Sequence, residues 1–122
     1  MTPKSFEKLV AEALDRIPPE FRAAMKNVAI IIQDRPGPEA YEEGIDDPDE
    51  VLYGLYQGVP LPERTPDDSG TAPDVIMLYQ KPLEEDFPNR EDLIREIEVT
   101  LVHEIAHYFG FGEETLERYG YD

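Results

Sequence analysis

Apolar residues recur at helical spacing in the first part of the 122-residue chain. Over residues 3–17 they return every three or four positions, and a Pro-Pro pair ends the pattern. Thr2 followed by Pro3 is typical of a helix N-cap with proline at the first helical position. The pattern therefore predicts an amphipathic helix over residues 3–17, and Pro19 can open a second short helix over residues 20–26.

Three β-prone runs follow in the middle of the chain. Residues 28–32 are continuously apolar, which is typical of a strand buried on both faces. Residues 51–57 predict a second strand, in which Gly54 indicates a bulge or a close backbone approach. Residues 74–80 predict a third strand. The loops between these runs are rich in proline, glycine and acidic residues and cover residues 34–50 and 58–73.

The last apolar segment, residues 89–109, predicts a long and centrally buried helix. Asn89 can cap this helix, and the acidic residues of its first turn suit the helix dipole. Apolar side chains, Tyr108 and Phe109 among them, occupy most of its circumference, which indicates burial on most sides. Gly110 is well placed to end the helix in a left-handed turn.

The net charge of the chain limits the classes of partner that it can bind. Its 28 acidic and 11 basic residues give a net charge of −17, which argues against nucleic acid or an anionic membrane as a partner. Such a charge attracts cations and basic peptides, although solubility is the favoured explanation of the excess of acidic residues. The chain has no cysteine, hence no disulfide or thiolate metal site. Without a signal-peptide pattern or a run of ~20 apolar residues, it is predicted to be cytoplasmic.

Both histidines of the chain lie in residues 103–107, which have the sequence His-Glu-Ile-Ala-His. On a helix this spacing sets the two imidazoles one turn apart, with roughly 5–6 Å between their Cβ atoms. Both can therefore bind one zinc ion at about 2.0–2.1 Å. Glu104 is rotated by about 100° around the helix and can address a metal-bound water without being a ligand. The motif predicts one zinc ion bound by His103 and His107, with Glu104 as general base.

The residues after the motif offer a third zinc ligand. With Gly110 and Glu113 the string becomes H-E-x-x-H-x-x-G-x-x-E, and in the metzincin pattern this last position is usually a histidine. A carboxylate oxygen also binds zinc, so Glu113 is the predicted third ligand and Glu114 the alternative. The other zincin arrangement, with a glutamate ligand on a later helix, is disfavoured because too few residues follow His107 for a return helix.

Three segments of the chain together resemble a known protein family: residues 52–64, residues 74–79 and residues 103–114. They resemble the small bacterial zincin-like metallopeptidases, minimal domains similar to the core of matrix metalloproteinases. The resemblance implies an α+β, zincin-like fold as a single domain over residues 1–122. It would hold an N-terminal helix, a small mixed sheet of three or four strands and a central zinc helix. One departure from the metzincins is that no methionine follows the site, since the last one is Met77.

These observations predict a monomeric, cytoplasmic zinc metallopeptidase that hydrolyses peptide bonds with a zinc-activated water. A non-catalytic zinc-binding or adaptor domain is the alternative, and a hydrolase of small non-peptide amides is a third possibility. Two histidines and a carboxylate also suit iron and other divalent ions. Tyr119 and Tyr121 are candidate oxyanion donors, although aromatic packing is favoured for both. The strand over residues 74–80 is the candidate for pairing with an extended substrate.

Overall fold

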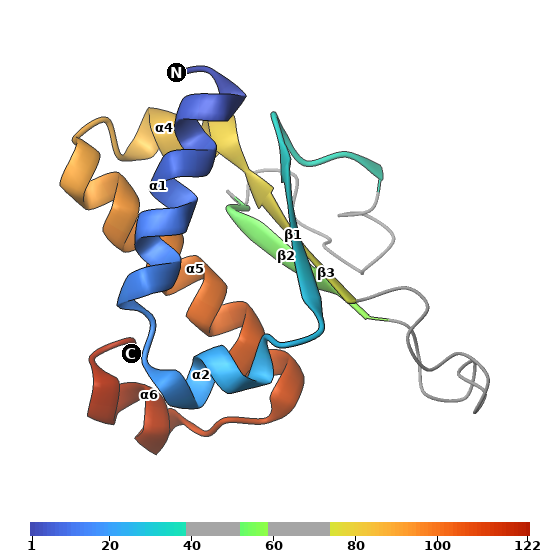
Figure 1. Cartoon of the computed structure of the whole chain (residues 1–122), viewed down its shortest axis with the longest axis vertical. Coiled ribbons are helices and arrows are strands. Elements are labelled where there is room, and N and C mark those ends of the chain that lie inside the picture. Colours follow the sequence, from blue (N-terminus) through green and yellow to red (C-terminus); the bar gives the residue numbers. More distant parts are fainter. Residues whose placement is uncertain (39–51, 59–73) are drawn as a thin grey trace.

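The computed structural model describes residues 1–38, 52–58 and 74–122 (Figure 1). Within these residues, helices α1 and α5 lie on the same side of a three-stranded mixed sheet, as the α+β prediction requires. The elements in chain order are α1 (Pro3–Arg16), α2 (Pro19–Ala24), β1 (Val28–Gln33), β2 (Gly54–Gln57), β3 (Asp74–Tyr79), α4 (Gln80–Asp86), α5 (Arg90–Phe109) and α6 (Glu113–Tyr119). The two predicted loops lie mostly outside the described residues.

Strand β3 is the central strand of the described sheet. It pairs in parallel with β1, with Val28 opposite Asp74, and antiparallel with β2, with Gly54 opposite Leu78. Both of its edges are therefore occupied by neighbouring strands. The prediction that residues 74–80 pair with a substrate is wrong, because only β1 and β2 are edge strands in the part of the sheet that is described.

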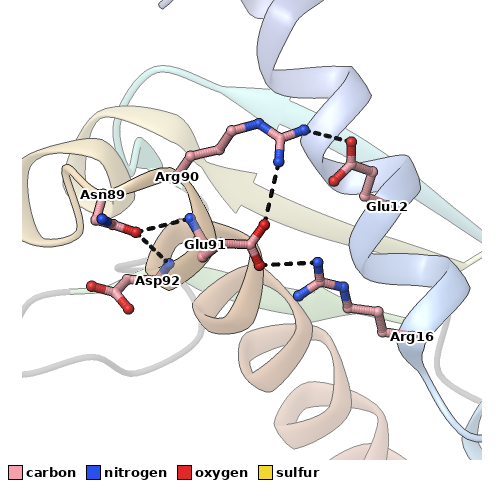
Figure 2. A network of polar contacts seen from close by, with 6 residues as sticks. All are labelled: Glu12, Arg16, Asn89, Arg90, Glu91 and Asp92. Atoms are coloured by element: carbon pink, nitrogen blue, oxygen red, sulfur yellow. Dashed lines mark hydrogen bonds and ion pairs between the residues drawn. The ribbon is translucent and has the colours of Figure 1, made fainter.

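The ends of the two long helices agree with the capping residues in the sequence. The Thr2 side chain accepts a hydrogen bond from the Ser5 backbone N–H at 3.1 Å and caps α1. The Asn89 side chain accepts from the first turn of α5 (Figure 2). Gly110 ends α5 with φ 77° and ψ 25°, the left-handed conformation that glycine adopts without strain.

Two short helices were not predicted. The chain passes from β3 directly into α4. Pro82 does not prevent this helix, because it lies in the first helical turn, where the backbone N–H would have no partner within the helix. Near the C-terminal end, α6 has seven residues and begins at Glu113, with Glu113 and Glu114 in the first turn, which favours acids. After His107 the structure has this short helix, although the sequence was expected to leave too few residues there for a return helix.

Strand β1 is less buried than its sequence predicts. All six of its residues are partly or largely exposed, and Ile31 is 44% exposed. Because alternate residues of a strand face opposite sides, Ile30 and Ile32 pack on the core while Ile31 faces away from the helices. The prediction of burial on both faces is wrong because Ile31 lies on the face of the sheet that is turned away from the core cluster.

Helix α5 is the centre of the core. Its buried residues are Leu93, Ile94, Ile97, Glu98, Leu101, Val102, Ile105 and Ala106. All of them except Glu98 belong to one cluster with apolar residues of α1 and β3. Tyr108 and Phe109 differ from the prediction, because they lie beyond this cluster and are 45% and 46% exposed. Among the described residues, no helix is both long and apolar enough to cross a membrane.

Surface ion pairs connect α1 with the first turn of α5 (Figure 2). The Arg90 guanidinium lies 2.5 Å from the Glu12 carboxylate, and the Arg16 guanidinium lies 3.1 Å from the Glu91 carboxylate. These four side chains are between 42% and 64% exposed, and exposed pairs typically contribute 0.2–1 kcal/mol. Apolar packing therefore holds the two helices together, and the ion pairs add little to it.

Gly54 is the point at which β2 approaches α5 most closely, as the sequence indicates. A Cβ at this position would lie 2.7 Å from Cγ2 of Thr100 and 3.1 Å from the backbone oxygen of Met77. We expect Gly54→Ala to lower the free energy of unfolding by about 1–3 kcal/mol, because β2 must move away from the helix. Urea unfolding followed by circular dichroism measures this change.

The Thr100 methyl group provides the control for this prediction. Serine has no Cγ2, so the double variant Gly54→Ala with Thr100→Ser should recover most of the lost free energy. A double-mutant cycle that shows no coupling between the two positions would contradict the steric explanation.

Candidate active site

The two histidines lie one turn apart in the second half of α5, as the motif predicts. His103 and His107 are exposed, whereas Glu104 is half-buried between the helix and the sheet. These two exposed imidazoles near the end of the helix are available to a ligand. The local geometry of the motif therefore follows directly from the helical spacing.

A cavity of about 370 Å³ opens against this turn of the helix. It is lined by His103, Glu104, Ala106, His107, Phe111, Glu113, Leu116, Tyr121 and Asp122, and we call it the α6-side cavity. Gly110 reverses the chain so that Glu113, the first residue of α6, returns to the cavity. The structure thus brings all four predicted site residues to one cavity, whereas Glu114 does not line it.

The candidate ligands do not stand in a coordinating arrangement. No three histidine, cysteine, aspartate or glutamate side chains in the described parts of the chain are close enough together to hold a metal ion. The Nε2 atom of His103 instead contacts the backbone carbonyl of Tyr121. The chemistry of the donors still suits zinc, which binds imidazole nitrogen and carboxylate oxygen. Metal binding at this cavity requires the side chains to rearrange.

Glu104 is connected to the edge strand β2. Its Oε1 atom accepts a hydrogen bond from the backbone N–H of Tyr56 at 2.9 Å. Burial raises the pKa of Glu104, and this hydrogen bond together with the electrostatic interactions with His107 and His103 opposes the rise. A carboxylate with a raised pKa is a better proton acceptor than an exposed one. Its position and chemistry therefore suit a general base.

The last described residues form the far wall of the α6-side cavity. Tyr121 is 4% exposed, and its hydroxyl donates to the buried carboxylate of Glu98. Arg95 contacts Glu98 at 3.1 Å, donates to the backbone oxygen of Gly120 at 2.7 Å and lies over the Tyr121 ring. Both the ring and the hydroxyl of Tyr121 are therefore held in place in this wall.

Neither of the two predicted oxyanion donors presents its hydroxyl to the cavity. Tyr121 uses its hydroxyl on Glu98, and Tyr119 donates to Glu20 at 2.8 Å. The rings of both tyrosines pack edge-on against Phe21. Aromatic packing, the interpretation that the sequence favours, describes both residues.

A second cavity, of about 380 Å³, lies between the motif and β2. We call it the β2-side cavity, and Leu55, Tyr56, Glu104, His107 and Tyr108 line it. Glu104 and His107 line both cavities. The candidate general base and one candidate ligand therefore lie where the two cavities adjoin.

Sequence reasoning missed several residues of these cavities. Asp122 reaches the α6-side cavity only because α6 turns the chain back, and no local pattern signals that return. Leu55 lines the β2-side cavity because β2 is an edge strand of the described sheet, and the strand order cannot be deduced from a local pattern. Tyr108 could have been noticed from its position directly after His107, but the apolar pattern indicated a core residue.

Comparison with protein-family models finds a match over most of the chain. A search of curated proteins finds no match to the chain. The family model described as zincin-like metallopeptidase matches residues 25–121. This match includes β1, the edge strand β2, all of α5 and every residue that lines the two cavities except Asp122. Because it covers far more than half of the sequence, the chain belongs to the zincin-like metallopeptidase family.

Proposed function

We propose that this protein is a zinc-dependent metallopeptidase in which His103, His107 and Glu113 hold the metal and Glu104 is the general base. The observation that carries the proposal is that these four side chains line one cavity at the end of α5. Membership of a metallopeptidase family suggests hydrolase activity and a peptide substrate. The cavity supports the choice of site residues, and the family match supports the class of reaction.

The carboxylate ligand is Glu113 in this proposal. It shares the α6-side cavity with both histidines, whereas Glu114 lies outside the lining residues. Asp122 brings another carboxylate to the same cavity and is the alternative. A zinc ion held there would act as a Lewis acid and lower the pKa of a water molecule in the site.

Glu104 performs the proton transfers. Its carboxylate takes a proton from the attacking water and later gives it to the leaving amine of the peptide. Partial burial favours this role because it raises the pKa of the carboxyl group. The hydrogen bond from Tyr56 holds the side chain at the edge of β2, where a substrate backbone would pass.

The substrate binds in an extended conformation along β2. Edge strands bind peptides through backbone hydrogen bonds, and β2 is the edge strand that lies beside the motif. In this arrangement the scissile bond lies near Glu104. We also propose that residues 1–122 form one domain that acts as a cytoplasmic monomer. Its net charge of −17 supports the proposal that it does not bind nucleic acid.

Metal content and peptide hydrolysis test this function together. Mass spectrometry of tag-free protein should find one zinc ion per chain, lost in His103→Ala, and the zinc-loaded protein should cleave a proteome-derived peptide library until a chelator is added. Zinc binding without cleavage would indicate the non-catalytic zinc-binding domain instead. A folded protein that stays metal-free after incubation with zinc would contradict both functions.

A further inference from the structure

The last turn of α5 exposes a group of aromatic rings. Tyr108 and Phe109 are 45% and 46% exposed, and their ring centroids lie 5.2 Å apart in an edge-on arrangement. The Tyr108 ring stacks on Tyr56 of β2, with centroids 3.9 Å apart and planes at 18°. We call the exposed Tyr108 and Phe109, together with the buried Tyr56 on which Tyr108 stacks, the aromatic platform. Exposed apolar side chains that lie together, and not singly, are typical of a binding surface.

The aromatic platform is continuous with the β2-side cavity. Tyr56 and Tyr108 line this cavity together with Leu55, while Glu104 and His107 form its other side. A side chain that rests on the platform therefore belongs to a ligand whose backbone can reach Glu104. This position separates the platform from an apolar patch elsewhere on the surface.

The platform is held in place before any ligand binds. Gly58 lies directly against the Tyr108 ring, since a Cβ at Gly58 would be 2.7 Å from Cζ of that tyrosine. The Tyr56 hydroxyl donates to the buried carboxylate of Asp74 at 2.8 Å. Rings that are already fixed lose little conformational entropy when a ligand packs on them.

The two cavities differ in charge. Glu104 is the one carboxylate among the described residues that line the β2-side cavity, whereas Glu113 and Asp122 add two more to the α6-side cavity. An apolar side chain is therefore accommodated better on the β2 side. Aromatic side chains gain further because they can stack on, or meet edge-on, the rings of Tyr108 and Phe109.

We propose that the aromatic platform is the specificity surface for the peptide substrate. It selects an extended segment that carries an aromatic or large apolar side chain close to the scissile bond, on the β2 side of Glu104. This inference rests on the peptidase function proposed above for its substrate class. Its binding component requires neither metal nor turnover.

Peptide binding to the metal-free protein tests the inference. The probes are fluorescently labelled ten-residue peptides that differ at one central position, which is Phe, Ala or Arg, and fluorescence anisotropy gives their Kd. We expect the Phe peptide to bind about tenfold more tightly than the Ala peptide. Equal affinity for the Phe and Ala peptides, or tightest binding of the Arg peptide, would overturn the proposal.

Variants of the aromatic platform test whether the preference for the Phe peptide depends on its rings. Tyr108→Ala and, separately, Phe109→Ala should each reduce the Phe preference, with circular dichroism as the check on folding. Ile31→Ala is the matched control, because Ile31 is similarly exposed, at 44%, but lies on the other edge strand. A preference that both platform variants retain would overturn the proposal. So would a dimer, detected by sedimentation velocity, that Tyr108→Ala dissociates, because the platform would then bind a second copy of the chain.

A cleavage experiment separates this inference from the peptidase function. In a peptide library cleaved by the zinc-loaded protein, aromatic residues should be enriched at one fixed position from the cleaved bond, and less so with Tyr108→Ala. Cleavage without such enrichment would contradict the role of the platform in specificity and would support the peptidase function. Aromatic-selective binding without any cleavage would support the platform as a binding surface and contradict the peptidase.

Discussion

Replacement of Glu104 by glutamine is expected to lower kcat for peptide hydrolysis by about 100-fold to 10,000-fold. Glutamine keeps the shape of the side chain, and its amide oxygen can still accept the hydrogen bond from the Tyr56 N–H. It cannot accept a proton from water at neutral pH, so the loss falls on the chemical step. Single-turnover kinetics with a peptide from the library measures it.

Zinc content and thermal stability should not change in this variant. Glu104 is not one of the proposed ligands, and the substitution removes no apolar contact from the core cluster. Glu117→Gln, an identical chemical change at an exposed position of α6 outside both cavities, should leave kcat unchanged. Full activity in Glu104→Gln would remove the general base from the proposed mechanism.

The same variant separates the two classes of function. A non-catalytic zinc-binding domain should bind its partner equally well with Glu or Gln at position 104, because neither fold nor metal depends on that charge. A peptidase should lose turnover and retain substrate binding. The half-buried position of Glu104, between the two cavities, favours the second outcome.

Features encoded by neighbouring residues could be predicted from the sequence. Thr2 and Asn89 mark the beginnings of α1 and α5, and Gly110 marks the end of α5, because each acts within one helical turn. The placement of His103 and His107 on one line of the helix follows from the same local geometry. These features do not depend on how the rest of the chain folds.

Features that depend on the order of the strands could not be predicted in this way. Residues 28–32 have the apolar run of a central strand but lie at an edge of the described sheet, and β3 takes the centre although it was the candidate for substrate pairing. Tyr108 has the spacing of a core residue but lies beyond the core cluster. In each case long-range packing decides whether the residue is buried. Helical or strand periodicity does not show which elements pack against each other.

The proposed third ligand shows how local and long-range information combine. The motif places an acid at the tenth position from His103, but two adjacent glutamates satisfy it almost equally well. The turn at Gly110 and the start of α6 at Glu113 distinguish them, because only Glu113 then lines the α6-side cavity. The same turn introduces Asp122 as a competitor from the end of the described chain.

Glu113→Gln is therefore expected to weaken zinc binding by about 100-fold or more. Loss of a residue that merely supports a ligand typically costs 10–100-fold in metal affinity, and loss of a ligand should cost at least as much. The affinity is measured by competition with a chromophoric chelator at fixed pH. Thermal unfolding without metal should be close to wild type, because Glu113 is exposed and belongs to no ion pair among the described residues.

Two further variants assign the carboxylate without ambiguity. Glu114→Gln makes the same change one residue later, outside the cavity, and should leave the zinc Kd nearly unchanged. Asp122→Asn should also have little effect if Glu113 is the ligand. A large loss in Asp122→Asn with none in Glu113→Gln would move the third ligand to the end of the described chain. It would mean that the packing of Tyr121 under α5, and not the spacing of the motif, completes the metal site.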